Sequence, residues 1–393
     1  MTYGGTTTGE RTALLVAVLL VAINHRPGVA SIAPVLENIR ADLGLGHAAA
    51  GFLTTLPVLC MGLFPVAAAR LAERLGLERT LFAGLALLAL ATAARLAGME
   101  AAVLFASALL IGVAVAANQT LVPAFIKLRF DRPLLVMGVY ATTITVGAGV
   151  PAGLTVPLMR LVEGWPAALA VWAVPAALAA IIWWWVVGLP RSAAPASAAG
   201  GTPWRTGRGW LIAFISSGAF GTFFSVLAWT APLYAEQGWS AESAGVLLTV
   251  VIACQITGNL LFAVIAHRAR DRRVWMVLAL LILMAGVSGM ALAPLAAPWL
   301  WVALAGLGGG GFFPLAMNLP LDNADNPTDV ARLTAMAQSA GYLLAAPLPA
   351  FLGWLRALSG GFAVPYLFLV GFGAALIVGV VLLRPPASPS RLA

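Results

Sequence analysis

The sequence has very few charged residues, a single lysine and two cysteines. Only 9% of the 393 residues are Asp, Glu, Lys or Arg, while 61% are hydrophobic, and soluble domains carry about 25% charged residues. Such a chain requires lipid as its solvent. The lysine, Lys127, precedes Leu128, so the phosphate-binding loop of ATP-driven pumps, which ends in Gly-Lys-Ser/Thr, is missing. The cysteines, Cys60 and Cys254, lie in apolar runs, and we expect neither a disulfide nor a metal site there.

Acidic residues are absent from every long apolar run. All fourteen Asp and Glu residues lie in predicted loops or at span ends. An intramembrane enzyme would need paired carboxylates, a histidine cluster or an activated Ser or Cys, and the sequence therefore predicts neither an enzyme nor a cofactor. A transporter of cations normally places a buried carboxylate opposite its substrate. A nucleic-acid partner is also excluded, because it would require a basic soluble face.

The chain contains twelve apolar runs long enough to cross a bilayer as helices, which takes about 20 residues each. We therefore predict an all-α integral membrane protein. The predicted spans are Thr12–Leu36, Ala48–Leu71, Thr80–Gly98, Ala101–Ile126, Leu134–Met159, Pro166–Val187, Gly209–Tyr234, Ser243–Ala266, Val274–Ala293, Trp299–Leu319, Leu333–Leu355 and Phe362–Leu383.

Basic residues are distributed unequally between the two sides of this map. Seventeen Lys and Arg residues fall on one side and four on the other, with Arg26 inside the first span. Because basic loops stay in the cytoplasm, both termini are predicted to be cytoplasmic. We expect a multi-pass monomer in the inner membrane of a bacterial cell.

The chain repeats itself at an offset of 194 residues. Cys60 aligns with Cys254 and Arg74 with Arg268, so the second span repeats as the eighth. Ile32–Leu36 (IAPVL) aligns with Thr230–Tyr234 (TAPLY) at an offset of 198, so the first span repeats as the seventh. The polar stretch between the two sets is rich in Ala, Gly, Ser and Pro. We expect a six-helix half over residues 1–188, a cytoplasmic linker over 189–208 and a second six-helix half over 209–393.

Several runs of residues carry a resemblance to a known family. They are NHRPGVASIAPVLENIRADLGLG from Asn24, GFLTTLPVLCMGLF from Gly51, NQTLVPAFIK from Asn118 and GVYATTITVGAGVPAGLTVPL from Gly138. The chain resembles the major facilitator superfamily, and within it the cyanate permease and 2-nitroimidazole transporter family. His25 departs from that family's usual apolar residue. In the fifth span Gly138 and Gly147 follow the antiporter motif, whereas its later Gly-Pro pair is replaced by Pro151 and Ala152.

The resemblance implies a secondary transporter that works by rocker-switch alternating access, with its substrate site between the two halves. It implies a small-molecule substrate that is anionic or nitro-aromatic, moved by symport or antiport with a coupling proton or a counter-anion. A second hypothesis, on the same fold, is efflux of uncharged or weakly anionic aromatic compounds. The direction of transport stays open.

Arg26 is the only charged side chain in the middle of a span, at a cost of about 2.5 to 3.5 kcal/mol. Pro27 cannot donate to the carbonyl of Ile23, so we expect a kink or a short unwound stretch here. The guanidinium suits small oxyanions, carboxylates or nitro groups. The alternative is that Arg26 joins helices by bonding carbonyls or Asn118 and Gln119.

The other candidate substrate-binding residues are polar or aromatic side chains within spans. On a regular helix Asn24, His25 and Arg26 point about 100° apart, and a break would let more than one of them reach a cavity. His25 either titrates as a proton carrier or bonds the backbone beside the proline, which is the more common role. The repeat pairs Asn24–Arg26 with Thr222–Phe224, which predicts one charged and one aromatic half. The repeat adds Thr222 and Phe223 to the candidates. The remaining candidates are polar residues for which a helix-to-helix bond is the more common role, namely Asn118, Gln119, Tyr140, Thr143, Gln255, Asn318 and Gln338.

Overall fold

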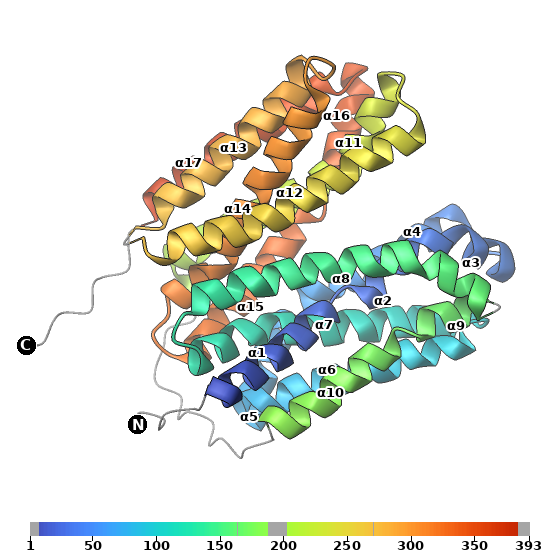
Figure 1. Ribbon diagram of the computed structural model, residues 1–393, viewed down its shortest axis with the longest axis vertical. Helices are drawn as coiled ribbons and strands as arrows, with labels where there is room; N and C mark the ends of the chain where they lie inside the picture. The colour runs from blue at the N-terminus through green and yellow to red at the C-terminus, as the bar shows by residue number, and fades with distance from the viewer. Residues whose placement is uncertain (1–7, 163, 188–202, 270, 384–393) are drawn as a thin grey trace, which may run out of the picture. The chain divides into compact units, whose positions relative to one another are not determined.

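The computed structural model describes residues 8–162, 164–187, 203–269 and 271–383, and within these ranges every regular element is a helix. The first part of the chain forms α1 (Thr8–Ile23), α2 (Pro27–Ala30), η1 (Ala33–Val35), α3 (Leu36–Leu43), α4 (His47–Leu63), α5 (Pro65–Leu75), α6 (Leu77–Ala93), η2 (Ala94–Ala97), α7 (Ala101–Arg129), α8 (Pro133–Leu161), α9 (Trp165–Ala170) and α10 (Ala173–Val187). The second part forms η3 (Pro203–Arg205), α11 (Gly207–Glu236), α12 (Ala241–His267), α13 (Arg273–Leu292), α14 (Pro298–Asp322), α15 (Pro327–Ala345), α16 (Leu348–Ser359) and α17 (Ala363–Leu382) (Figure 1).

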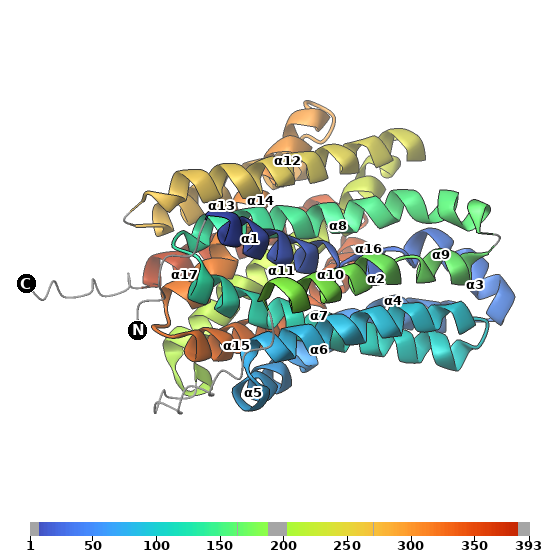
Figure 2. The same cartoon turned by 60° about the horizontal axis from the view of Figure 1, so that its bottom comes forward.

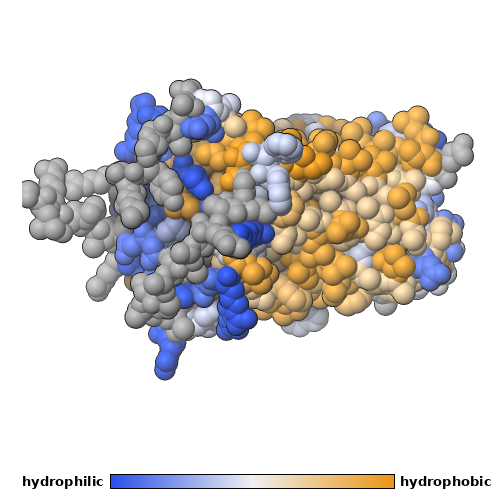
Figure 3. Space-filling model, turned by 90° about the horizontal axis from the view of Figure 1, so that it is seen from below, coloured by the Kyte–Doolittle hydropathy of each residue, from blue (hydrophilic) through white to orange (hydrophobic). Residues whose placement is uncertain are grey.

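Helices of membrane-spanning length account for nearly all of the described residues. Eleven of them are long and apolar enough to cross a bilayer. A bent pair, Ala49–Leu63 and Pro65–Leu75 with an angle of 52° between its parts, makes twelve when it is counted as one span. Hydrophobic residues cover the helical surface visible in Figure 3, and hydrophilic residues gather toward the ends. The predicted all-helical membrane fold is confirmed.

Span boundaries differ from the predicted ones where prolines or charged residues lie near a membrane end. The predicted first span, Thr12–Leu36, is part of a longer run, Gly9–Leu43, and is interrupted as expected before Pro27. The predicted eleventh span, Leu333–Leu355, is too short, because the run extends over Pro327–Ser359. Charged side chains near the end of a span, such as Arg332, suit the membrane interface, so a span can extend beyond its apolar core.

The chain divides by its contacts into two compact units. The first comprises Met1–Asp131 and Val139–Gly200, and the second comprises Arg132–Gly138 and Gly201–Ala393. Most of the predicted linker, 189–208, lies outside the described residues, which resume at Pro203. We describe the two units separately below.

The internal repeat extends to a pair of close helix contacts. In the first unit, a Cβ placed on Gly112 of α7 would lie 2.7 Å from both Cys60 Cβ and Pro57 Cα on α4. In the second unit, a Cβ on Gly306 of α14 would meet the Val251 carbonyl and lie 3.0 Å from Cys254 Cβ on α12. All three pairs, Gly112 with Gly306, Cys60 with Cys254 and Pro57 with Val251, keep the offset of 194. Each unit therefore joins its second and fourth spans through a glycine that lets the two backbones approach.

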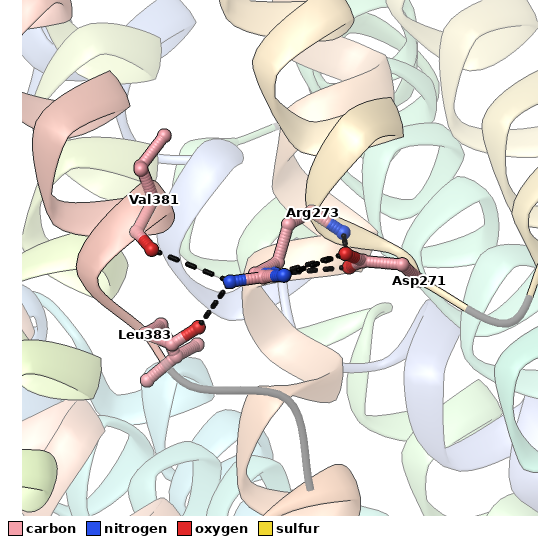
Figure 4. A network of polar contacts seen from close by, with 4 residues as sticks. All are labelled: Asp271, Arg273, Val381 and Leu383. Carbon is pink, nitrogen blue, oxygen red and sulfur yellow. Dashed lines mark hydrogen bonds and ion pairs between the residues drawn. The ribbon is translucent and has the colours of Figure 1, made fainter.

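In the second unit, a polar network fastens the start of α13 to the end of α17 (Figure 4). Arg273 Nη1 donates to the carbonyls of Val381 at 3.3 Å and Leu383 at 3.1 Å, which lie at the C-terminus of α17. Arg273 Nη2 also pairs with Asp271 Oδ2 at 2.7 Å. A cation suits a helix C-terminus, where the last carbonyls lack partners within the helix. Side-chain hydrogen bonding to Arg273 lowers the pKa of Asp271 below the ordinary aspartate value.

Candidate functional site

The candidate site in the first unit begins at the break between α1 and α2. Because Pro27 carries no amide hydrogen, α1 ends at Ile23, and a short turn over residues 24–26 precedes α2. The His25 amide bonds the carbonyl of Ala22 at 3.1 Å, and the Arg26 carbonyl accepts from the amides of Val29 and Ala30. The predicted break is thus confirmed, and it separates the first span into two helical pieces.

Two glycines allow neighbouring helices to lie against this break. A Cβ on Gly147 of α8 would meet the carbonyl of Ile23 and lie 3.1 Å from its Cα. A Cβ on Gly28 of α2 would lie 2.8 Å from Cγ2 of Ile111 on α7. The break is therefore held closely on two sides, by α8 at its start and by α7 just beyond it.

Asn24 bonds helices together within the first unit. Its Nδ2 donates to the carbonyl of Leu20 at 2.8 Å and to that of Pro175 on α10 at 3.2 Å. Helices α1 and α10 pack against each other in this unit (Figure 2). Both N–H groups of the amide are thereby satisfied, and Asn24 acts as a connector between α1 and α10 rather than as a free ligand for a substrate.

His25 points toward α8 and not toward the backbone. Its side chain is fully buried, and its Nδ1 lies 3.4 Å from the hydroxyl of Tyr140. The two rings meet edge to face, with centroids 5.8 Å apart. The other ring nitrogen, Nε2, is enclosed and has no hydrogen-bond partner among the described residues. The expected backbone bond from the His25 ring is therefore wrong.

Arg26 differs from both of its neighbours. The residue is 9% exposed, against 0% for His25. Throughout the described ranges, no hydrogen bond or ion pair reaches its guanidinium, so it bonds neither carbonyls nor Asn118 and Gln119. A structural arginine in lipid would be expected to satisfy its donors. The helix-joining bonds that the alternative reading of Arg26 would require are not present in the described residues.

The other predicted residues of the first unit do not gather around Arg26. Asn118 on α7 is fully buried against Gly84 of α6, where a Cβ would be 3.0 Å from the amide carbon, and neither amide atom has a partner in the described structure. Gln119 is buried beside it. The Thr143 hydroxyl bonds its own helix through the Val139 carbonyl at 2.8 Å. Of this set only Tyr140, through His25, belongs to the break.

In the second unit, aromatic rings occupy the positions that the repeat pairs with the break. α11 runs without interruption through Thr222–Phe224, and Ser225 stands at the position equivalent to Pro27. Phe220 stacks on Tyr342 of α15 with centroids 4.1 Å apart and meets Phe313 of α14 edge to face at 5.8 Å. Phe223 lies 6.2 Å from Phe313. The expected contrast of a charged and an aromatic half is present in these side chains. Phe220 and Phe313 were not predicted from the sequence. The spacing of residues 220, 223 and 224 could have indicated Phe220, because it places three rings on one helix face.

Gln255 on α12, together with Thr222 and Phe223, lines a small cavity in the second unit. The cavity volume is about 20 Å³, and its wall is completed by Val226, Leu227, Val251, Leu283, Ala305, Gly306 and Gly309. The Gln255 Oε1 atom is enclosed without a partner in the described structure, and Thr222 Oγ1 bonds the Gly218 carbonyl at 2.7 Å. Such a volume is about that of one water molecule. The remaining candidates, Asn318 on α14 and Gln338 on α15, are buried but do not line this cavity.

A second buried arginine, Arg95, lies near the end of the predicted third span, Thr80–Gly98. It lies in η2 and is 0% exposed, and its Nε bonds Ser107 Oγ at 3.2 Å. Its Nη1 and Nη2 atoms are enclosed and have no partner in the described ranges. Arg95 is therefore a buried cation with no access for a ligand, whereas Arg26 retains some exposed surface.

Comparisons with known proteins decide the family. The model of the Major Facilitator Superfamily matches residues 18–346 and 209–393. The chain belongs to the major facilitator superfamily. Members of this superfamily are transporters, so this chain is a multi-pass membrane transporter and not an enzyme. The expected resemblance and fold are both confirmed.

Within the superfamily, the chain is similar to two transporters of Escherichia coli strain K12. It is 34% identical over 382 residues to the cyanate transport protein CynX, covering 96% of this chain and 98% of that protein. It is 29% identical over 365 residues to the 2-nitroimidazole transporter, covering 91% of each. Both relatives therefore match the chain over nearly its full length.

Solved superfamily structures share the fold at low sequence identity. The proton:xylose symporter XylE matches with a TM-score of 0.76 and 13% identity over 97% of each chain. The human organic anion transporter TETRAN matches with a TM-score of 0.75 and 15% identity over 94% of this chain and 99% of that one. At such identities the likeness concerns the fold alone.

Proposed function

We propose that this superfamily member is a secondary active transporter of a small anion or a small nitro-aromatic compound, and that Arg26 binds the electron-rich group of the substrate. The observation that supports this most is the guanidinium of Arg26, which has no partner in the described structure and sits at a helix break. Its planar donors match oxyanions and nitro groups. The printed names of two full-length relatives, for cyanate and 2-nitroimidazole, concern the same kinds of compound.

The test is transport by purified protein in liposomes. We would compare uptake of cyanate, 2-nitroimidazole, acetate and a quaternary ammonium cation, with empty liposomes as the control. The proposal expects transport of at least one of the first three and none of the cation, because the described span interiors hold no carboxylate to pair with a cation. Transport of the cation alone would overturn the proposal.

Efflux of uncharged or weakly anionic aromatic compounds is a second candidate, supported by the rings of Phe220, Phe223, Phe313 and Tyr342 in the second unit. Here aromatic stacking, worth about 0.5 to 1.5 kcal/mol per pair, would carry more of the affinity than the cation. Phe223→Leu should then weaken 2-nitroimidazole binding by about two- to tenfold and leave cyanate binding unchanged. Equal loss for both compounds would count against this candidate.

We also propose that both termini face the cytoplasm of a bacterial cell and that transport proceeds by alternating access, as a monomer. The support is the unequal distribution of basic residues, seventeen against four. A reporter fused after Ala393 should be active only in the cytoplasm, and one inserted at Gly46 only outside. A cytoplasmic signal at Gly46 would reverse the proposed orientation.

A further inference from the structure

His25 is the only side chain in the interior of a described span that can change charge in the physiological range. The acidic residues of the described spans lie in first or last turns, except for Glu37 and Asp42, which lie in α3. Histidine gains its charge between about pH 5 and 8, which no other unperturbed side chain does. His47 and His267 lie at helix ends. The interior thus combines one permanent cation at the break, Arg26, with one adjacent ionisable ring.

The surroundings of His25 contain few groups that could stabilise or oppose a charge on it. On its own element the neighbour is Arg26, and on α8 it is the Tyr140 hydroxyl at 3.4 Å. Helix α10 has no ionisable side chain, and α7 has only Lys127 and Arg129, both in its last turn. Besides Tyr140, α8 has only Arg160 in its last turn, and the charged residues of α1, Glu10 and Arg11, lie at its start. A proton on His25 would therefore lie beside the Arg26 cation with no anion near to balance it.

We propose that His25 takes up one proton from solvent when an anion binds at Arg26, so that anion and proton are bound and carried together. This inference rests on the proposed function. The bound anion would offset the repulsion between the Arg26 and His25 cations, because a nearby opposite charge favours the charged form of an ionisable group. By thermodynamic linkage, a proton that binds more tightly in the anion complex also tightens anion binding.

Tyr140 suits both charge states of the ring. Its hydroxyl can donate to Nδ1 of the neutral imidazole and can accept from Nδ1–H of the charged one. The contact at 3.4 Å thus orients the ring and leaves Nε2 to gain and lose the proton. Tyr140 is accordingly a positioning residue.

Carrying both species removes an electrical cost. Moving a monoanion into a negative interior costs about 2.3 kcal/mol per 100 mV, whereas an anion with a proton crosses as a neutral pair. Wild-type uptake should therefore be electroneutral, and a variant without His25 should transport the anion alone and be slowed by an inside-negative potential.

The experiment measures proton uptake and affinity with potassium cyanate, and with potassium thiocyanate as a second linear anion. Protein without a polyhistidine tag, in weakly buffered detergent solution at pH 7, is mixed with saturating anion beside a pH indicator. We expect close to one proton taken up per anion bound, and an affinity that rises by up to tenfold for each unit of decrease in pH. His25→Gln should take up no proton on anion binding, and its anion affinity should not vary with pH.

A second measurement does not depend on the folding of a His25 variant. Changing His47→Gln and His267→Gln leaves His25 as the only histidine, and nitrogen NMR of the labelled ring reports its charge directly. Addition of cyanate should convert the ring from neutral to charged. A ring that stays neutral, binding without proton uptake, or uptake retained in His25→Gln would overturn the inference while leaving Arg26 as the anion site. Failure of wild-type protein to bind any anion would instead remove the proposed function and this inference with it.

Discussion

The two units use equivalent spans in opposite ways. In the first unit, the span that begins with α1 breaks before Pro27 and presents Asn24, His25 and Arg26. In the second unit, α11 has Ser225 at the position of Pro27, continues unbroken, and carries Thr222, Phe223 and Phe224 instead. The helix scaffold repeats while the chemistry on it does not. A proline accompanies the break in the first unit and is absent from the equivalent position of α11, and only the first unit has a charged side chain beside that position.

The two units share the packing of their second and fourth spans. Both units bring a glycine of the fourth span against a cysteine of the second, Gly112 on Cys60 and Gly306 on Cys254. Duplication has therefore preserved the positions where backbones touch, because a side chain there would push helices apart. The two units differ instead at residues 24–26 and 222–224, which are polar or charged in the first unit and mainly aromatic in the second.

The largest effect should come from breaking the shared packing. Gly306→Val should abolish folding, or cost more than about 3 kcal/mol, because the new side chain meets the backbone of Val251. Gly112→Val should do the same in the first unit. Gly309→Ala is the matched control, since the nearest atom to its added Cβ is 4.0 Å away. Size-exclusion chromatography and thermal unfolding in detergent measure all three, and a tolerated Gly112→Val would show that the two contacts are not equivalent.

The next effect should come from making the first unit resemble the second at the break. Pro27→Ser restores the amide that can bond the Ile23 carbonyl, so the helix should run on and turn Arg26 away from its present position. We expect cyanate affinity to fall by at least about tenfold, or 1.4 kcal/mol, with an unchanged or raised unfolding temperature. Pro157→Ser, the same change in α8, is the control and should leave affinity unaltered. Full affinity in Pro27→Ser would mean that the break does not position the site.

The smallest effect concerns the network of Asp271 and Arg273 in the second unit. Since bonding to Arg273 lowers the pKa of Asp271 in the folded state, the carboxylate contributes stability above the unfolded value of about 4, and this is lost as pH falls through the folded value. Asp271→Asn should therefore lower the free energy of unfolding at pH 7 by less than about 1 kcal/mol, because the pair is partly exposed to solvent. The difference from wild type should shrink progressively as the pH falls below about 4. An unchanged difference at acid pH would assign the effect to something other than the charge.

Much of this architecture could be predicted from the sequence, because its signals are long and periodic. Apolar runs give the spans, and the offset of 194 residues gives the repeat. Pro27 gives the break because a missing amide acts locally. Side-chain partners were harder to predict, because direction on a helix depends on rotation and packing. Asn118 faces Gly84 of α6, and Asn24 reaches Pro175 of α10, although both are as polar as any ligand residue.

The burial of arginine side chains was also hard to predict from the sequence. Arg95 lies three residues before Gly98, the predicted end of the third span. We expected an exposed side chain at such a boundary, but Arg95 is fully buried. Its enclosure arises from the packing of η2 against α7 and α9, which are distant in sequence from one another. No pattern in the sequence around Arg95 predicts such a contact. Arg26 could be singled out only because it stands in the middle of an apolar run.

The central claim is that Arg26 binds the electron-rich group of the substrate, and its replacement tests this most directly. Arg26→Lys, Arg26→Ala and the control Arg95→Met would be compared with wild type for folding by size-exclusion chromatography and for cyanate and 2-nitroimidazole affinity. We predict that Arg26→Ala folds and binds neither compound, that Arg26→Lys loses most affinity because an ammonium lacks the planar fork, and that Arg95→Met binds normally with unchanged or higher stability. Folded Arg26→Ala protein that binds both compounds with near wild-type affinity would contradict the account.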